Sequence, residues 1–113
     1  MSRISSHVLD TAIGRPARSL GLRLDRLEEG GGWTTLGRAV TGDAGRVANV
    51  VPGTELPVGT YRLTFETASY LEAAGRPVFF PQVDVVFRVD DAGQHFHIPL
   101  LLSPFGYSTY RGG

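Results

Sequence analysis

The feature that most constrains this chain is the strict alternation of apolar and polar residues in short runs. In GTYRLTFET, Tyr61, Leu63 and Phe65 share one parity and polar residues take the other. This pattern indicates a strand with one buried and one wet face. RSLGLRLDRLE, VDVVFRVD and HFHIPLLL alternate in the same way, with turn signals such as GDAG and DAGQ between runs. The runs recur at spacings of about 8–12 residues, which predicts an all-β antiparallel sandwich or barrel of about eight strands.

One short segment departs from the strand pattern. ASYLEAAG has helical rather than alternating periodicity, and Gly75 follows it as a stop signal. We therefore expect one short helix near residues 68–75, inserted between two strands. The chain has 113 residues and 42% hydrophobic content, which fits one domain over residues 1–113.

Composition excludes several classes of function. Eleven basic residues balance eleven acidic ones, whereas a nucleic-acid-binding domain usually carries a basic excess. No apolar run reaches the roughly 18 residues of a membrane-spanning helix, so we expect neither nucleic acid nor membrane as a partner. Cysteine is absent, which excludes disulfides, thiol nucleophiles and thiolate metal ligands. The N-terminal MSRISSHVLD has no apolar signal segment, so a cytoplasmic location is expected.

The three histidines are the best candidates for chemistry. His7 takes the parity opposite Val8, and His97 takes the parity opposite Phe96 and Ile98, so both point away from the predicted core. They are either exposed strand residues or, if their strands are neighbours, a pair able to exchange protons near neutral pH.

A zinc site is a separate alternative. His95 and His97 lie on one face of a strand, about 7 Å apart, and a third histidine could complete a three-histidine site. No cysteine is present, and no acidic residue stands near either histidine. We therefore predict that the protein holds no metal.

Other polar residues carry weaker signals. Arg46 follows the turn GDAG and is either solvated or, beside a cleft, able to bind an anionic or imide-like substrate through two hydrogen bonds. Ser103 and Ser108 have no histidine or acidic partner at a recognisable spacing, so a serine nucleophile is not predicted. Four aspartates look like turn and edge residues: Asp10, Asp84, Asp90 and Asp91.

The two ends of the chain, SSHVLDTAIGRPA and HFHIPLLLSPFGYSTYRGG, resemble the signatures of the transthyretin-like proteins, and in particular of the 5-hydroxyisourate hydrolases of urate breakdown. The resemblance continues through DAGRV, GTYRLTFET, YLEAAG and FFPQVDVVFRV and covers essentially the whole chain. The final motif is specific, because a transthyretin hormone carrier shares LLSP and YST but lacks the histidines and the YRG ending. The resemblance implies a two-sheet prealbumin sandwich of eight strands with one short helix.

The resemblance also implies roles for single residues. It makes His7, Arg46 and His97 catalytic, with His7 and Arg46 also binding substrate, and it leaves His95 in a non-catalytic position. Tyr110 would line the substrate site.

At the C-terminus, the resemblance implies that Arg111 and Gly113 bind substrate. The segment from Arg111 to Gly113 would close a channel between dimers, in which the substrate lies. The family's Tyr-Arg-Gly ending is followed by a serine or threonine. This chain has Gly113 there, so the hydroxyl group of the family pattern is missing.

The activity implied by the resemblance is hydrolysis of the cyclic amide of 5-hydroxyisourate to 2-oxo-4-hydroxy-4-carboxy-5-ureidoimidazoline. A histidine-activated water would attack the substrate without any cofactor. The implied assembly is a homotetramer, a dimer of dimers with its sites at the dimer–dimer interface. The alternative is a non-catalytic transthyretin-like protein that binds or transports a small aromatic ligand.

Overall fold

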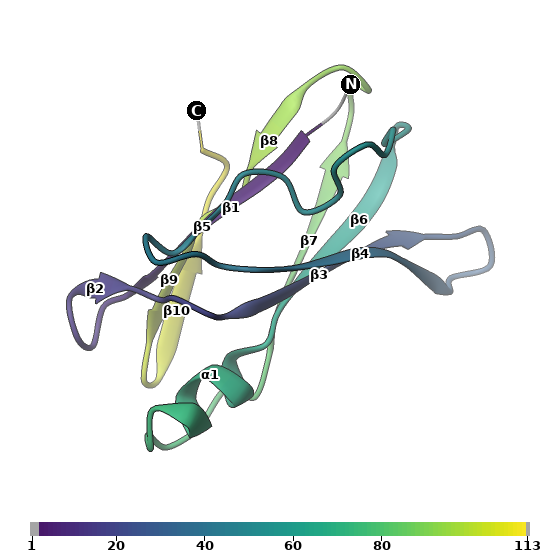
Figure 1. The fold of residues 1–113 in the computed structure, drawn as a ribbon. Helices are drawn as coiled ribbons and strands as arrows, with labels where there is room; N and C mark the ends of the chain where they lie inside the picture. Colours follow the sequence, from purple (N-terminus) through teal and green to yellow (C-terminus); the bar gives the residue numbers. More distant parts are fainter. Residues whose placement is uncertain (1–2, 113) are drawn as a thin grey trace.

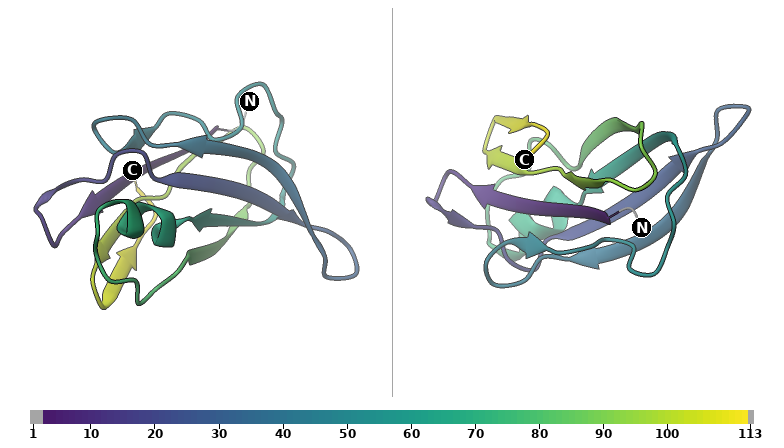
Figure 2. Two further views of the ribbon diagram at one scale, coloured as in Figure 1. Left: turned by 60° about the horizontal axis from the view of Figure 1, so that its bottom comes forward. Right: turned by 90° about the horizontal axis from the view of Figure 1, so that it is seen from above.

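The computed structural model describes residues 3–112, which form two packed β-sheets with a short helix at one end (Figures 1 and 2). One sheet contains β3 (Gly21–Leu27), β4 (Trp33–Val40), β6 (Gly59–Phe65) and β7 (Val83–Val89). The other contains β1 (Arg3–Asp10), β2 (Arg15–Pro16), β5 (Arg46–Val47), β8 (His95–His97), β9 (Leu100–Ser103) and β10 (Gly106–Thr109). The predicted sandwich is confirmed. The described residues form ten strands rather than about eight, partly because β2 and β5 are pairings of two residues each.

The four-stranded sheet has the order β4-β3-β6-β7 and is antiparallel throughout. Tyr61, Leu63 and Phe65 of β6 are fully buried, as their alternation predicted. Leu22 and Leu24 of β3 pair with Phe65 and Leu63 and join the same core. Full burial of each large apolar side chain contributes about 1.5–3 kcal/mol to folding, so this face holds the sandwich together.

The second sheet is built around β1. This strand pairs antiparallel with β2 and β5, and parallel with β8 and β9. The expected antiparallel order therefore does not extend to the pairs with β8 and β9. Parallel neighbours need a long crossover, and the whole four-stranded sheet lies between β1 and β8 in the chain.

The predicted helix is confirmed as α1 (Thr67–Ala73). Gly75 follows it with φ of +68°, a left-handed conformation that glycine adopts without a Cβ clash. The Thr67 hydroxyl donates to the Phe80 carbonyl at 2.6 Å and ties the start of α1 to the segment before β7. With seven residues, α1, the one helix within residues 3–112, is too short to cross a membrane.

Asp10 is the last residue of β1 and directly precedes the turn at residues 11–14, as predicted, but it is fully buried. Its carboxylate accepts hydrogen bonds from the Arg76 guanidinium (Nη2–Oδ1 3.2 Å) and from the Tyr70 hydroxyl at 2.7 Å. Burial alone would raise the pKa of Asp10, but the hydrogen bonds from Arg76 and Tyr70 outweigh it and hold that pKa below its usual value. Burial, with the hydrogen bond to Asp10, raises the pKa of Tyr70 to about 12. This buried carboxylate therefore ties β1 to α1 and to the segment after it.

We expect Arg76→Ala to destabilise the fold by about 3 kcal/mol at neutral pH, because it leaves a buried carboxylate without its cation. In the unaltered chain the folded pKa of Asp10 lies below the unfolded value. The stability from this pair is therefore present above the unfolded pKa and is lost as pH falls through the folded pKa. The variant should lose less stability than the unaltered chain on acidification, as measured by urea unfolding at a series of pH values.

Arg26→Ala is the matched control. Its ion pair with Glu28, at 3.0 Å, is solvent-exposed, and exposed pairs contribute little to stability. Asp25 also has a lowered pKa, because bonds from Thr35 and two arginines outweigh its burial, and it is retained in both variants. Equal destabilisation by the two substitutions, or an unchanged acid dependence in Arg76→Ala, would contradict the assigned role of the pair.

Candidate functional site

The site is built on the polar side of β1. Side chains alternate along a strand, so Arg3, Ser5 and His7 lie on one face. Ile4 and Val8 lie on the other face and are fully buried in the core. His7 therefore points away from the core, as its parity predicted.

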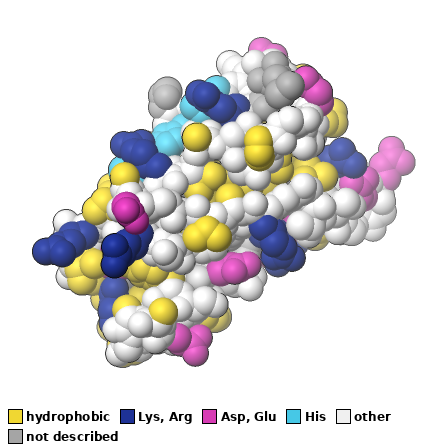
Figure 3. Space-filling model, viewed as in Figure 1, with side chains coloured by type: hydrophobic (Ala, Val, Ile, Leu, Met, Phe, Trp, Pro, Cys, Tyr) yellow, Lys and Arg dark blue, Asp and Glu magenta, His cyan; other side chains and the backbone are white. Residues whose placement is uncertain are grey.

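Strands on the two sides of β1 bring further polar residues to this face. On the β8 side, Arg3 pairs with His95 and Ser5 pairs with His97. On the β5 side, His7 pairs with Arg46. Directly paired residues point to the same face of a sheet, so residues far apart in the chain meet here. Figure 3 shows the histidine side chains in a row at the surface beside Lys or Arg side chains.

A shallow hollow of about 350 Å³ lies over this face. Its lining includes two of the three predicted catalytic residues, Arg46 and His97, while His7 flanks it through its pairing with Arg46. The full lining is Arg3, Ser5, Ser6, Arg46, Val47, Ala48, His95 and His97. Arg46 is exposed and has no ion pair with any residue that the structure describes, so its guanidinium is available to a substrate.

Each imidazole of the site is oriented by a hydrogen bond. The Ser5 hydroxyl lies 2.6 Å from Nε2 of His95 and 2.7 Å from Nδ1 of His97. His7 Nε2 donates to the Ala44 carbonyl at 3.0 Å. These contacts leave Nε2 of His97 and Nδ1 of His7 without a partner within residues 3–112. One nitrogen of each ring can therefore bind substrate or water.

Two histidines of the site have lowered pKa values, which favours their neutral form. Burial lowers the pKa of His97, and the nearby His95, Arg46 and His7 lower it further. Burial, followed by the charge of Arg3, lowers the pKa of His95. A neutral imidazole has one donor and one acceptor nitrogen, which suits proton exchange with a bound water.

The sequence did not predict Ser5 and Arg3 as residues of the site, and His95 was expected in a non-catalytic position. The signal was present, since Arg3 and Ser5 share the parity of His7 on one strand. Nothing in the local pattern showed that His95 and His97 would lie beside them.

The tail of the chain is held against His97. The Gly112 N–H donates to the His97 carbonyl at 2.7 Å. The Arg111 guanidinium stacks 4.6 Å from the centre of the Phe96 ring and donates to Gln94 at 2.9 Å. The segment therefore packs against the strand of His97, although neither Arg111 nor Gly112 lines the histidine hollow. Gly113 lies outside the described residues.

Tyr110 lies elsewhere in the single chain. It is 58% exposed and lines a separate apolar hollow of about 220 Å³, together with Phe87, Phe96 and Arg111. The residues that line the histidine hollow do not include it. Within one copy of the chain, Tyr110 and His97 are not brought to the same hollow.

The geometry gives the zinc alternative no support. The hydroxyl of Ser5 occupies the space between the facing nitrogens of His95 and His97, whose ring centres are 6.4 Å apart. Among residues 3–112, no three His, Cys, Asp or Glu side chains are grouped so that they could hold a metal ion.

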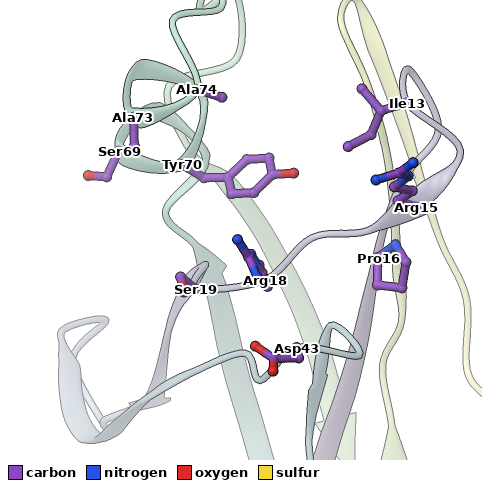
Figure 4. A pocket seen from close by; sticks show the side chains of 10 residues that line it. All are labelled: Ile13, Arg15, Pro16, Arg18, Ser19, Asp43, Ser69, Tyr70, Ala73 and Ala74. Carbon is purple, nitrogen blue, oxygen red and sulfur yellow. The ribbon is translucent and has the colours of Figure 1, made fainter.

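A larger hollow, of about 700 Å³, lies beside α1. In Figure 4, Tyr70 reaches across it from α1 toward Ile13 and Arg15. The Tyr70 hydroxyl is already bonded to Asp10, and no histidine lines this space. Size alone does not supply proton-transfer groups, so we assign the chemistry to the smaller histidine hollow.

The chain is similar to known proteins along nearly its whole length. A family model described as the HIUase/Transthyretin family matches residues 4–112. A 5-hydroxyisourate hydrolase of Mus musculus is 45% identical over 112 residues, covering 98% of this chain and 95% of the relative. The solved structure of Klebsiella pneumoniae 5-hydroxyisourate hydrolase is similar with a TM-score of 0.86 and 40% identity, covering 100% of both chains. Sea bream transthyretin, solved in complex with thyroxine, is similar with a TM-score of 0.90 and 32% identity, covering 97% of this chain and 94% of the other.

We expect Gly112→Ala to displace the His97 ring without unfolding the protein. A Cβ at this position would lie 3.0 Å from Cγ of His97 and 3.2 Å from its Cβ, closer than side chains normally pack. The expected result is a shift of the His97 ring resonances in NMR spectra. Gly106→Ala is the control, because a Cβ there would meet nothing within 4 Å. Unchanged His97 resonances in Gly112→Ala would contradict the contact.

Proposed function

Because this chain belongs to the HIUase/Transthyretin family, whose model matches residues 4–112, we propose that it hydrolyses the cyclic amide of 5-hydroxyisourate. The product is 2-oxo-4-hydroxy-4-carboxy-5-ureidoimidazoline. The observation that carries the proposal is the meeting of His7, Arg46 and His97 on one face of the β1 sheet. A cytoplasmic location stays a prediction.

The chemistry needed is the addition of water to an amide carbonyl. One imidazole takes a proton from the water as it attacks C6, and the bond between N1 and C6 then breaks. The Arg46 guanidinium, exposed and without an ion pair among the described residues, binds the substrate oxygens and stabilises the charge that develops on them. This route needs no cofactor.

For the remaining predicted residues, Tyr110, Arg111 and Gly113, we propose contact with substrate or closure of the site. Arg111 is fixed by Phe96 and Gln94 next to the strand of His97, which supports a role in closing the site. Tyr110 is exposed in one copy of the chain. We propose that it contacts substrate across an interface with another copy, and that Gly113 adds main-chain atoms without a hydroxyl.

We also propose a homotetramer, a dimer of dimers with the sites at the dimer–dimer interface. β7 and β10 end their sheets, and unprotected sheet edges pair readily with other chains. Large apolar side chains are exposed on or beside these strands: Val86, Phe105, Tyr107 and Tyr110. Such groupings mark association surfaces.

The catalytic proposal predicts faster loss of 5-hydroxyisourate, generated from urate by urate oxidase and followed by ultraviolet absorbance. His97→Ala and His7→Ala should each lower kcat by about 100-fold or more, because each removes an imidazole that either activates the water or stabilises the charge on the carbonyl oxygen. Arg46→Lys should also lower kcat, since an ammonium cannot reproduce the two-point contact.

Arg38→Lys is the matched control, since Arg38 lies on β4 and pairs with Glu66 at 3.6 Å, away from the histidines. If 5-hydroxyisourate disappears at only its spontaneous rate in the presence of the unaltered protein, the proposed enzymatic activity is refuted. Tight binding of a planar aromatic ligand without turnover would favour the transthyretin-like carrier instead.

The assembly proposal predicts a mass of four chains by light scattering. Val86→Lys should reduce this mass, because it places a charge on the exposed face of an edge strand. Val58→Lys, at an equally exposed position outside the strands, should leave it unchanged. A mass of one chain at every concentration would contradict the tetramer.

A further inference from the structure

Four side chains on the histidine face form a continuous hydrogen-bonded chain. Arg3 Nη2 lies 3.3 Å from Nδ1 of His95. Nε2 of His95 lies 2.6 Å from Oγ of Ser5, and Oγ lies 2.7 Å from Nδ1 of His97. Ser5 is only 7% exposed, so water has little access to replace the two contacts of its hydroxyl group, whereas the contact between Arg3 and His95 is exposed.

The chemistry of the four groups fixes which atom donates and which accepts in each of these hydrogen bonds. A guanidinium only donates, so Nδ1 of His95 must accept, and neutral His95 carries its proton on Nε2. That proton is donated to Oγ of Ser5. The hydroxyl has a single proton of its own, which it then donates to Nδ1 of His97. Neutral His97 is left with its proton on Nε2, the nitrogen free of partners among the described residues.

His7 is fixed in the complementary state. A carbonyl oxygen only accepts, so the 3.0 Å contact with Ala44 places a proton on Nε2 of His7. In the neutral ring the lone pair is then on Nδ1. The two imidazoles of the site therefore offer unlike nitrogens, a donor from His97 and an acceptor from His7.

We propose that Arg3, His95 and Ser5 are positioning residues that fix His97 as a hydrogen-bond donor through Nε2 and so leave His7 as the base. This assignment rests on the proposed hydrolase function. Its core claim, the tautomer of His97, can be measured without substrate.

The reaction balances with these roles. A water oxygen bonds to C6 while one water proton moves to Nδ1 of His7. The electron pair of the carbonyl shifts to its oxygen, which is stabilised by Nε2–H of His97 and by Arg46. The oxyanion then collapses, the bond between C6 and N1 breaks, and N1 takes the proton held by His7. His97 donates a hydrogen bond throughout and gives up no proton.

The electrostatics of the face support a neutral donor. The charged or titratable groups around His97 are His7 on β1, Arg46 on β5 and His95 on β8, and together with burial they lower its pKa. Arg3 on β1 acts in the same direction on His95. A protonated His97 would carry protons on both nitrogens and could not accept from Ser5. The hydrogen-bond directions given above therefore hold for the neutral form, which these groups favour.

The direct test is the tautomer of each histidine, read from two-bond ¹⁵N–¹H correlations in the NMR spectrum of the whole protein. The unaltered chain should show neutral His97 with its proton on Nε2. Arg3→Gln should give mixed His97 tautomers, because an amide can donate or accept and no longer imposes a direction. Arg3→Lys, which only donates, should retain the single tautomer. Neutral His97 protonated on Nδ1 in the unaltered protein would overturn the proposal.

Kinetic measurements on variants of Ser5 provide a second test. Ser5→Ala should lower kcat by roughly 10- to 100-fold with little change in KM, because the ring of His97 loses its orientation, and Ser5→Thr should restore most of the rate. Ser69→Ala, at an exposed serine on α1, is the matched control. Full activity and an unchanged His97 tautomer in Ser5→Ala would overturn the positioning role. Failure of the unaltered protein to hydrolyse 5-hydroxyisourate would refute the proposed function instead, whatever the tautomer.

Discussion

The site depends on the pairing of β1 with strands on both sides. Alternation sends Ile4 and Val8 into the core and therefore forces Ser5 and His7 onto the opposite face. A slip of one residue would reverse this assignment and place polar groups in the core. Because the core fixes the register of β1, it also fixes which residues of β5 and β8 stand beside His7 and Ser5.

Two further contacts hold this arrangement at its ends. Beyond the site, the carboxylate of Asp10 ties the last residue of β1 to Arg76 and Tyr70. On the outer side of β8, the main chain of Gly112 closes onto His97, and Arg111 stacks on Phe96. Arg111 and Gly112 thus hold the strand of His97 in place.

Local sequence patterns predicted most of the fold. Alternation identified the buried faces of β3 and β6, and the outward direction of His7 and His97 followed from the same rule. These local patterns did not predict the contacts between segments that are distant in the sequence. Ser5 meets His97 across 92 positions, and Asp10 meets Arg76 across 66. A polar residue next to apolar neighbours has the same local sequence pattern whether it is solvated or paired in the fold, so neither the burial of Asp10 nor the role of Ser5 was predicted.

We propose that the chemistry occurs at the small histidine hollow rather than at the larger hollow beside α1. The most direct measurement is a crystal structure of the protein with a planar, non-hydrolysable purine analogue of the substrate. We expect the analogue to lie over the β1 face, with its oxygens bound to Arg46 and one edge at Nε2 of His97. An analogue seated instead between Tyr70 and Arg15, with the histidine face empty, would contradict it.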